Sequence, residues 1–117
     1  MTTFMLIHTT LTSKRLPMDH EATLQNEIER TLHCAGIPAI REYSLGKGSR
    51  IDFLCQDGVG IELKLRGTAM SIAKQLKRYE KSDEIKSLIL VTGKNVDPKP
   101  LGFSKPISTI WLAKAWL

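Results

Sequence analysis

Two carboxylates and a lysine stand at spacings that could hold a divalent metal ion. Glu62 follows Asp52 by ten positions, and Lys64 follows Glu62 by two. Because side chains alternate along a strand, Glu62 and Lys64 share one face, about 6.5 to 7 Å apart along the strand. Carboxylate oxygens suit Mg²⁺ and leave positions open for water and phosphate. A neighbouring lysine can polarise a water or stabilise charge on a phosphoryl oxygen, so these residues predict metal-assisted phosphodiester hydrolysis.

The same residues also have a purely structural interpretation. Glu and Lys on the outer face of an alternating strand are typical of any half-solvated antiparallel hairpin. The loop at Asp57-Gly58 distinguishes the two interpretations. A strict two-residue turn there would place Asp52 opposite Leu63 and on the wrong face. We therefore predict a three- or five-residue loop, or a bulge, so that Asp52 shares a face with Glu62 or Lys64.

The elements that must position these residues are a series of helices and strands. Apolar residues recur at helical spacing before the site, and apolar alternation marks the strands that carry it. The sequence predicts a helix over 19–35, strands at 41–45, 50–55 and 60–65, a helix from 69 or 71 to 81, a buried strand at 87–92, and a last strand from 107. This order favours an α/β fold with one domain, over 17–117, and a central mixed sheet flanked by helices. Residues 1–16 are expected to be a loose arm or an added strand.

Length and composition fit one ordinary globular domain. The chain has 117 residues, of which 42% are hydrophobic and 25% are charged, which excludes disorder, collagen and coiled coil for the whole chain. The longest apolar run, 88–91, is far short of the roughly 20 residues of a membrane span, so no membrane partner is expected. No signal peptide is expected, because no basic residue precedes the apolar stretch 4–7. Cys34 and Cys55 lack metal-ligand spacing, which predicts reduced core cysteines and a cytoplasmic protein.

Positive charge is in excess and is concentrated around the second helix. Seventeen Lys and Arg against twelve Asp and Glu give a net charge of +5, which suits an anionic partner such as nucleic acid. A basic stripe follows the helix at Lys74, Lys77, Arg78 and Lys81, although a solvated helix face would look the same. The candidate phosphate contacts are Lys47, Arg50, Arg66, Lys74, Lys77 and Arg78.

Together these residues resemble the PD-(D/E)XK nuclease superfamily. Arg50-Ile51-Asp52 followed by Ile61-Glu62-Leu63-Lys64 is similar to its Asp…Glu-x-Lys signature, with Ile51 in place of the usual proline. The segment from Gln75 to Tyr79 is similar to the Gln-x-x-x-Tyr motif of RecB-like and exonuclease members. The order of elements over roughly 20 to 92 also matches that family. The resemblance implies a restriction-endonuclease-like core.

The resemblance also implies roles for individual residues. Asp52 and Glu62 would bind Mg²⁺ or Mn²⁺ together with the backbone carbonyl of Leu63, and Lys64 would position or activate the attacking water. A further acidic ligand would come from the first helix, where we choose Glu21 ahead of Glu27. Glu21 could instead be a first-turn carboxylate that the helix dipole favours. The remaining pair, Gln75 and Tyr79, would orient the site or the nucleic acid, although Tyr79 could also be a core residue.

The expected protein is a metal-dependent deoxyribonuclease with no small-molecule cofactor. An endonuclease that cuts branched DNA, such as a junction, is an expectation by analogy only, and the residues leave exonuclease activity open. A non-catalytic DNA-binding module or an accessory or structural protein on the same fold is the alternative. The apolar residues at 110–112 and 116–117 could form a homodimer surface or pack on the core.

Overall fold

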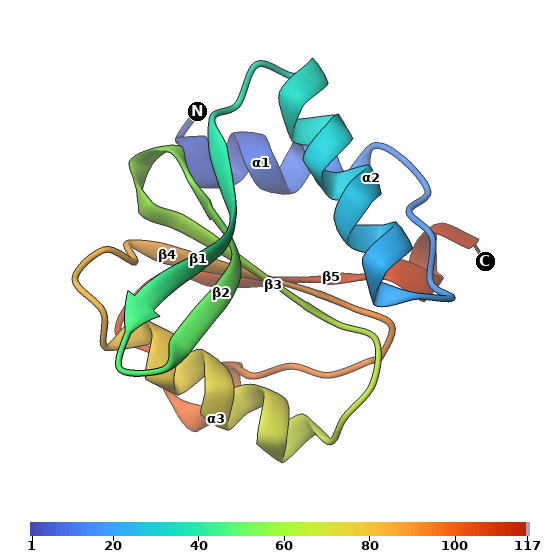
Figure 1. Cartoon of the computed structure of the whole chain (residues 1–117). Helices are drawn as coiled ribbons and strands as arrows, with labels where there is room; N and C mark the ends of the chain where they lie inside the picture. Colours follow the sequence, from blue (N-terminus) through green and yellow to red (C-terminus); the bar gives the residue numbers. More distant parts are fainter. Residues whose placement is uncertain (117) are drawn as a thin grey trace.

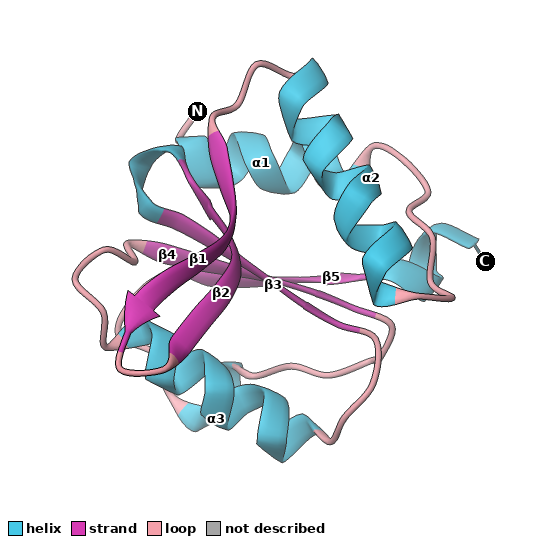
Figure 2. Cartoon of the chain, in the orientation of Figure 1, coloured by secondary structure: helices cyan, strands magenta, loops and turns pink. Residues whose placement is uncertain are grey.

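The centre of the computed structural model is a mixed β-sheet that helices cover on both faces (Figures 1 and 2). The structure describes residues 1–116, in which there are three α-helices and five strands. The helices are α1 (Thr3–Thr12), α2 (Glu21–Cys34) and α3 (Ala69–Glu80), and the strands are β1 (Ala39–Gly46), β2 (Ser49–Cys55), β3 (Val59–Lys64), β4 (Ser87–Thr92) and β5 (Ile107–Trp111). The predicted α/β fold with a central mixed sheet is confirmed.

The strands lie in sequence order from β1 to β5. Strands β1, β2 and β3 pair antiparallel, whereas β3, β4 and β5 pair parallel. Helix α3 connects β3 to β4, as a parallel pair requires a long crossover. All six residues of β4 are buried, as predicted from its continuous apolar run. Strand β3, which carries the predicted site, is therefore held between a hairpin partner and a buried strand.

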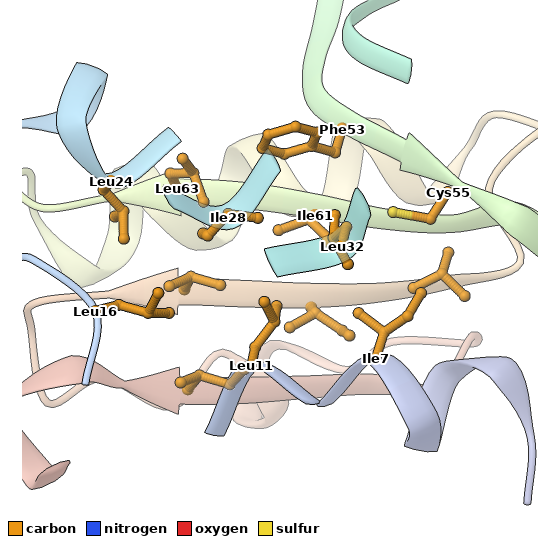
Figure 3. Close-up of a cluster of buried hydrophobic side chains, with 14 of the residues drawn as sticks. Ile7, Leu11, Leu16, Leu24, Ile28, Leu32, Phe53, Cys55, Ile61 and Leu63 are labelled. Carbon is orange, nitrogen blue, oxygen red and sulfur yellow. The ribbon is translucent and has the colours of Figure 1, made fainter. Parts of the chain in front are cut away.

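Each face of the sheet has its own apolar core. Helices α1 and α2 lie on one face and α3 on the other (Figure 1). In Figure 3, Ile28 of α2 lies beside Ile61 of β3, and Leu11 of α1 and Phe53 of β2 belong to the same cluster. The second cluster contains the predicted stripe of α3, which is Ile72, Leu76 and Tyr79, packed with Leu88, Leu90 and Ile85. The second core fixes α3 against the face that carries the candidate site.

The expectation of a loose arm or an added strand for residues 1–16 is wrong. Residues 3–12 form α1, whose first turn is capped by the Thr2 hydroxyl accepting from the backbone N–H of Met5 at 3.1 Å. Ile7 and Leu11, four residues apart, are fully buried against the sheet. Threonine is a weak helix former, so the Thr-rich composition obscured this apolar spacing. Tertiary burial of the apolar pair outweighs the low propensity.

Two smaller expectations also change, whereas the last strand begins at Ile107 as predicted. Helix α2 begins at Glu21 rather than near Asp19, and His20 gives no side-chain cap. Cys55 is buried as expected, but Cys34 is exposed at the end of α2, so it is not a core residue. The last strand ends at Trp111, and a short 3-10 helix follows over Leu112–Trp116. Within residues 1–116, no helix has both the length and the apolar character needed to cross a membrane.

The predicted dimer surface is partly used within the chain. The Trp116 indole N–H donates to the carbonyl of Leu16 at 3.3 Å, and the Arg15 guanidinium lies 5.3 Å from the centre of its ring. Ile110 is buried in the core cluster of the α1–α2 face, as the alternative interpretation expected. Leu117, which belongs to the same predicted surface, lies outside the described residues. The homodimer stays a prediction.

Candidate metal and nucleic-acid site

A three-residue loop places Asp52 opposite Glu62. The chain leaves β2 after Cys55, makes a 3-10 turn over Gln56–Gly58 and enters β3 at Val59. Asp57 and Gly58 adopt left-handed backbone conformations, with φ of 60° and 71°, which close the turn. Because Phe53 pairs with Ile61, the next position along the ladder brings Asp52 to Glu62. The predicted loop length is confirmed, and the two carboxylates share a face.

The two strands separate at Asp52. At this end of the β2–β3 ladder the last pair is Phe53 with Ile61. Beyond it, the Asp52 Oδ2 accepts the backbone N–H of Leu63 at 2.8 Å, and the backbone N–H of Asp52 donates to Glu62 Oε1 at 3.4 Å. The N–H and C=O of a strand residue point to the same edge, so the Leu63 carbonyl is also directed toward this gap. Its direction is compatible with the metal contact that the resemblance implies.

Burial and like charge make this carboxylate pair unfavourable without a cation. Glu62 is 3% exposed. Burial raises the pKa of Glu62 to about 8, the Asp52 carboxylate raises it as well, and the Lys64 ammonium acts in the opposite direction. Lys64 Nζ lies 3.6 Å from Glu62 Oε2, and the Lys64 side chain is 30% exposed, so Lys64 links the buried Glu62 carboxylate to the surface. A divalent cation between the carboxylates would relieve their repulsion.

Helix α3 supports the site through a short hydrogen-bond chain. Gln75 Nε2 donates to the Tyr79 hydroxyl at 2.7 Å, and this hydroxyl donates to the Arg50 carbonyl at 2.8 Å. Arg50 is two residues before Asp52, so the chain holds β2 where it leaves β3. Burial and the Glu62 carboxylate raise the pKa of Tyr79, which keeps its hydroxyl protonated as a donor. The structure thus brings Gln75 and Tyr79 to the carboxylate pair.

The structure does not bring a third acidic residue to the pair. Among residues 1–116, no three His, Cys, Asp or Glu side chains are grouped to hold a metal ion. Glu21 is exposed at the first position of α2. Glu27 is paired with Arg30 and lies 3.9 Å from Lys14 Nζ. The donor set that fits a metal is therefore two carboxylates and a backbone carbonyl, which suits Mg²⁺ because this ion keeps several waters and phosphate ligands.

Sequence reasoning gave no role to two polar residues that the structure buries wholly or in part, Glu80 and Gln25. Gln25, one turn after Glu21, accepts from Arg41 Nη2 at 2.9 Å, while its Nε2 is buried without a hydrogen-bond partner in the described part of the chain. Glu80 accepts the backbone N–H groups of Ser104 and Lys105 at 2.6 and 3.0 Å, which attaches the loop before β5 to α3. The sequence position of Glu80, directly after Tyr79 of the apolar stripe, was the signal that could have predicted its burial.

Most of the predicted phosphate contacts line two surface hollows. The first, here called the Lys64 hollow, has a volume of about 380 Å³ and includes Lys64, Arg66, Lys74, Gln75 and Arg78. The second, the hairpin hollow between the β1–β2 turn and α3, has about 760 Å³ and includes Lys47, Arg50, Gln75, Arg78, Tyr79 and Lys81. Both hollows adjoin the carboxylate pair, through Lys64 in one and Tyr79 in the other.

Lys77 is the exception among the basic residues. Its ammonium donates to Glu80 Oε1 at 3.3 Å and to the Gly102 carbonyl, and it lies 5.1 Å from the centre of the Phe103 ring. These contacts direct Lys77 to the loop that precedes β5, and it lines neither hollow. The expected phosphate contact by Lys77 is therefore not supported by its position. The basic stripe of α3 is divided between a surface role and a structural one.

No protein-family model, curated protein or solved structure matches this chain. A functional assignment therefore depends on the geometry of the chain itself. That geometry consists of two facing carboxylates, of which Glu62 is buried and Asp52 partly buried, a lysine beside them and basic hollows on either side.

Proposed function

We propose that this protein is a divalent-metal-dependent nuclease of the PD-(D/E)XK type that hydrolyses DNA phosphodiester bonds. The observation that carries the proposal is the buried Glu62 carboxylate, with the partly buried Asp52 opposite it and Lys64 Nζ 3.6 Å away. A solvated hairpin face would leave Glu62 in water, whereas here it is 3% exposed. Acidic residues are almost never fully buried without a partner or a metal. The single Lys64 ammonium faces two carboxylates, so a bound metal ion accounts for the remaining negative charge.

In this proposal each residue has a distinct role. Asp52, Glu62 and the Leu63 carbonyl would hold Mg²⁺ or Mn²⁺, which would supply charge for the phosphoryl oxygens and lower the pKa of an attacking water. The Lys64 ammonium would donate a hydrogen bond to that water or to a phosphoryl oxygen as negative charge develops. Tyr79 touches no reacting atom and acts as a positioning residue, because its hydroxyl fixes the Arg50 carbonyl near Asp52.

DNA is the proposed substrate because the basic hollows adjoin the carboxylate pair. Lys and Arg side chains supply the salt-dependent part of nucleic-acid binding by contacting phosphates. In both hollows cations outnumber acidic residues, and Asp83 is the acidic residue that lines the hairpin hollow. A cytoplasmic location and a homodimer that acts on branched DNA belong to the same proposal as predictions.

The test is cleavage of labelled linear, single-stranded and branched DNA in the presence of Mg²⁺ or Mn²⁺. Wild-type protein is compared with Lys64→Ala and Asp52→Asn, and Lys99→Ala is the control because Lys99 is exposed and lines neither hollow. We expect metal-dependent cleavage that falls by about 100-fold or more in the two site variants and is unchanged in the control.

Two results would contradict the proposal. Cleavage that persists in both site variants would assign the activity to another site or to a contaminant. Salt-sensitive binding without cleavage, in every metal tested, would favour the non-catalytic DNA-binding module. A rise in the unfolding midpoint with Mn²⁺ that Asp52→Asn removes would separately establish the metal site, because a ligand that binds only the folded state stabilises it.

A further inference from the structure

The Lys64 hollow and the hairpin hollow meet at the middle of α3. Gln75 and Arg78 line both of them, so the two are neighbouring parts of one surface path. The path follows α3 from Ser71, in the Lys64 hollow, to Lys81, in the hairpin hollow. The ten helical rises from Ser71 to Lys81 correspond to about 15 Å. At the 3.4 Å rise of one B-DNA strand, this length fits about four nucleotides.

The carboxylate pair lies beside the middle of this path. Lys64, whose ammonium is 3.6 Å from Glu62, lines one hollow. Tyr79, which Glu62 influences electrostatically, lines the other together with Arg50. Cations therefore lie on both sides of the pair, with Arg66 and Lys74 on one side and Lys47 and Lys81 on the other. Arg78 stands at the junction of the two hollows.

A substrate strand bound along this path would have phosphates on both sides of the bond to be cut. An enzyme that acts at strand ends needs cationic contacts on one side of the reacting phosphate only, because the strand stops on the other side. Here each hollow carries at least three Lys or Arg side chains, and both hollows are open to solvent. The distribution of charge is that of a site through which the strand continues.

We infer that the enzyme cuts phosphodiester bonds inside a strand, an inference that rests on the proposed nuclease function. One nucleic-acid strand passes through both hollows, and no strand end is required. Water attacks the phosphorus, the bond from phosphorus to one sugar oxygen breaks, and the departing oxygen receives a proton. The products are one phosphate monoester and one hydroxyl end. One water is consumed for each bond, and no other reactant is needed.

The first experiment uses covalently closed circular single-stranded DNA and the same sequence in linear, end-labelled form, with Mn²⁺. We expect the circle to be opened at a rate within about threefold of internal cutting of the linear strand. Release of mononucleotides from the linear strand, with the circle left intact, would overturn the inference while leaving the nuclease function in place. If neither single-stranded DNA is cut, the inference fails, and the cleavage test on linear and branched DNA decides whether the proposed nuclease function fails as well.

The second experiment measures binding to a 20-nucleotide single strand in EDTA, so that cleavage is not required. Arg66→Ala changes the Lys64 hollow and Lys81→Ala changes the hairpin hollow. We expect each to weaken binding by about threefold to tenfold and to reduce the slope of log K against log salt by about 0.7. The control is Arg30→Ala, since Arg30 belongs to α2 on the opposite face of the sheet (Figure 1). Loss of affinity in only one hollow would overturn the continuous path.

Discussion

Replacing Glu62 by glutamine removes a buried negative charge while keeping nearly the same shape. In the metal-free protein this charge is unfavourable, because Glu62 is 3% exposed and its backbone neighbour across the strands is Asp52. Burial, together with the Asp52 carboxylate, raises the pKa of Glu62 from 4.5 to about 8. The metal-free folded state therefore retains a proton on Glu62 over a pH range in which the unfolded chain has released it.

The sign and size of the effect follow from linkage. Because the folded state binds more protons between pH 4.5 and about 8, the free energy of unfolding falls as pH rises through this window. The slope from one such group is about 1.4 kcal/mol per pH unit. Glu62→Gln has no proton to lose there, so it should match wild type near pH 4.5 and exceed it by about 4 kcal/mol at pH 8.

The assay is urea denaturation in EDTA at pH 5, 6, 7 and 8, followed by circular dichroism. The difference in unfolding free energy between Glu62→Gln and wild type isolates this residue from all other titrating groups. Glu29→Gln is the control, because the Glu29 side chain is 55% exposed. With saturating Mn²⁺ the order should reverse, since wild type gains metal binding and the variant loses a ligand. A difference that stays constant from pH 5 to pH 8 would refute the electrostatic argument.

Three further predictions concern packing and positioning. Gly60→Ala should lower the free energy of unfolding by about 1 to 3 kcal/mol in a urea titration, because its new Cβ would lie 2.6 Å from Ile51 Cδ1. Gly93→Ala is the control and should have little effect, because the nearest atom to its new Cβ would lie at 3.5 Å. Tyr79→Phe removes the hydroxyl that holds β2 at 2.8 Å, so calorimetry should show a loss of about 1 kcal/mol and cleavage should slow without loss of secondary structure. Although burial opposes it, hydrogen bonds from two backbone N–H groups at 2.6 and 3.0 Å lower the pKa of Glu80. Glu80→Gln should therefore be about 2 kcal/mol less stable at pH 7, and this deficit should shrink as pH falls below 4.5, which denaturation at pH 7 and pH 3.5 would measure.

Local periodicity in the sequence was sufficient to predict most of the helices and strands, and it contributed to the prediction of the loop between the two strands of the site. Alternation at Phe53 and Cys55 and again at Ile61 and Leu63 predicted the paired strands. The hypothesis that Asp52 shares a face with Glu62 or Lys64 then predicted a three- or five-residue loop, or a bulge, between them. The structure has that loop at Gln56–Gly58. These predictions succeeded because strand alternation and helix spacing are properties of neighbouring residues. The first helix was missed because its threonines have low helix propensity, although its apolar pair was visible.

Other parts of the site depended on contacts between distant residues. Glu62 and Lys64 have the same types and spacing in a solvated hairpin as in a buried site, so the sequence left both interpretations open. Burial under α3 shields Glu62, and the separation of β2 from β3 at Asp52 leaves the Asp52 carboxylate beside it. The hydrogen bond from Tyr79 to the Arg50 carbonyl likewise joins residues 29 positions apart.

The sequence by itself determined the residue types and most of the elements, and it limited the register between the two strands to two alternatives, of which one brings Asp52 to Glu62. Only the tertiary structure decided which charges are free to act: Lys77 is bound to the loop before β5, Glu21 stays at the surface, and Arg78 lies where two basic hollows meet. The physical reason is that periodicity specifies the face on which a side chain stands. The neighbours of that face, and hence its desolvation and charge, are set by how helices pack on the sheet.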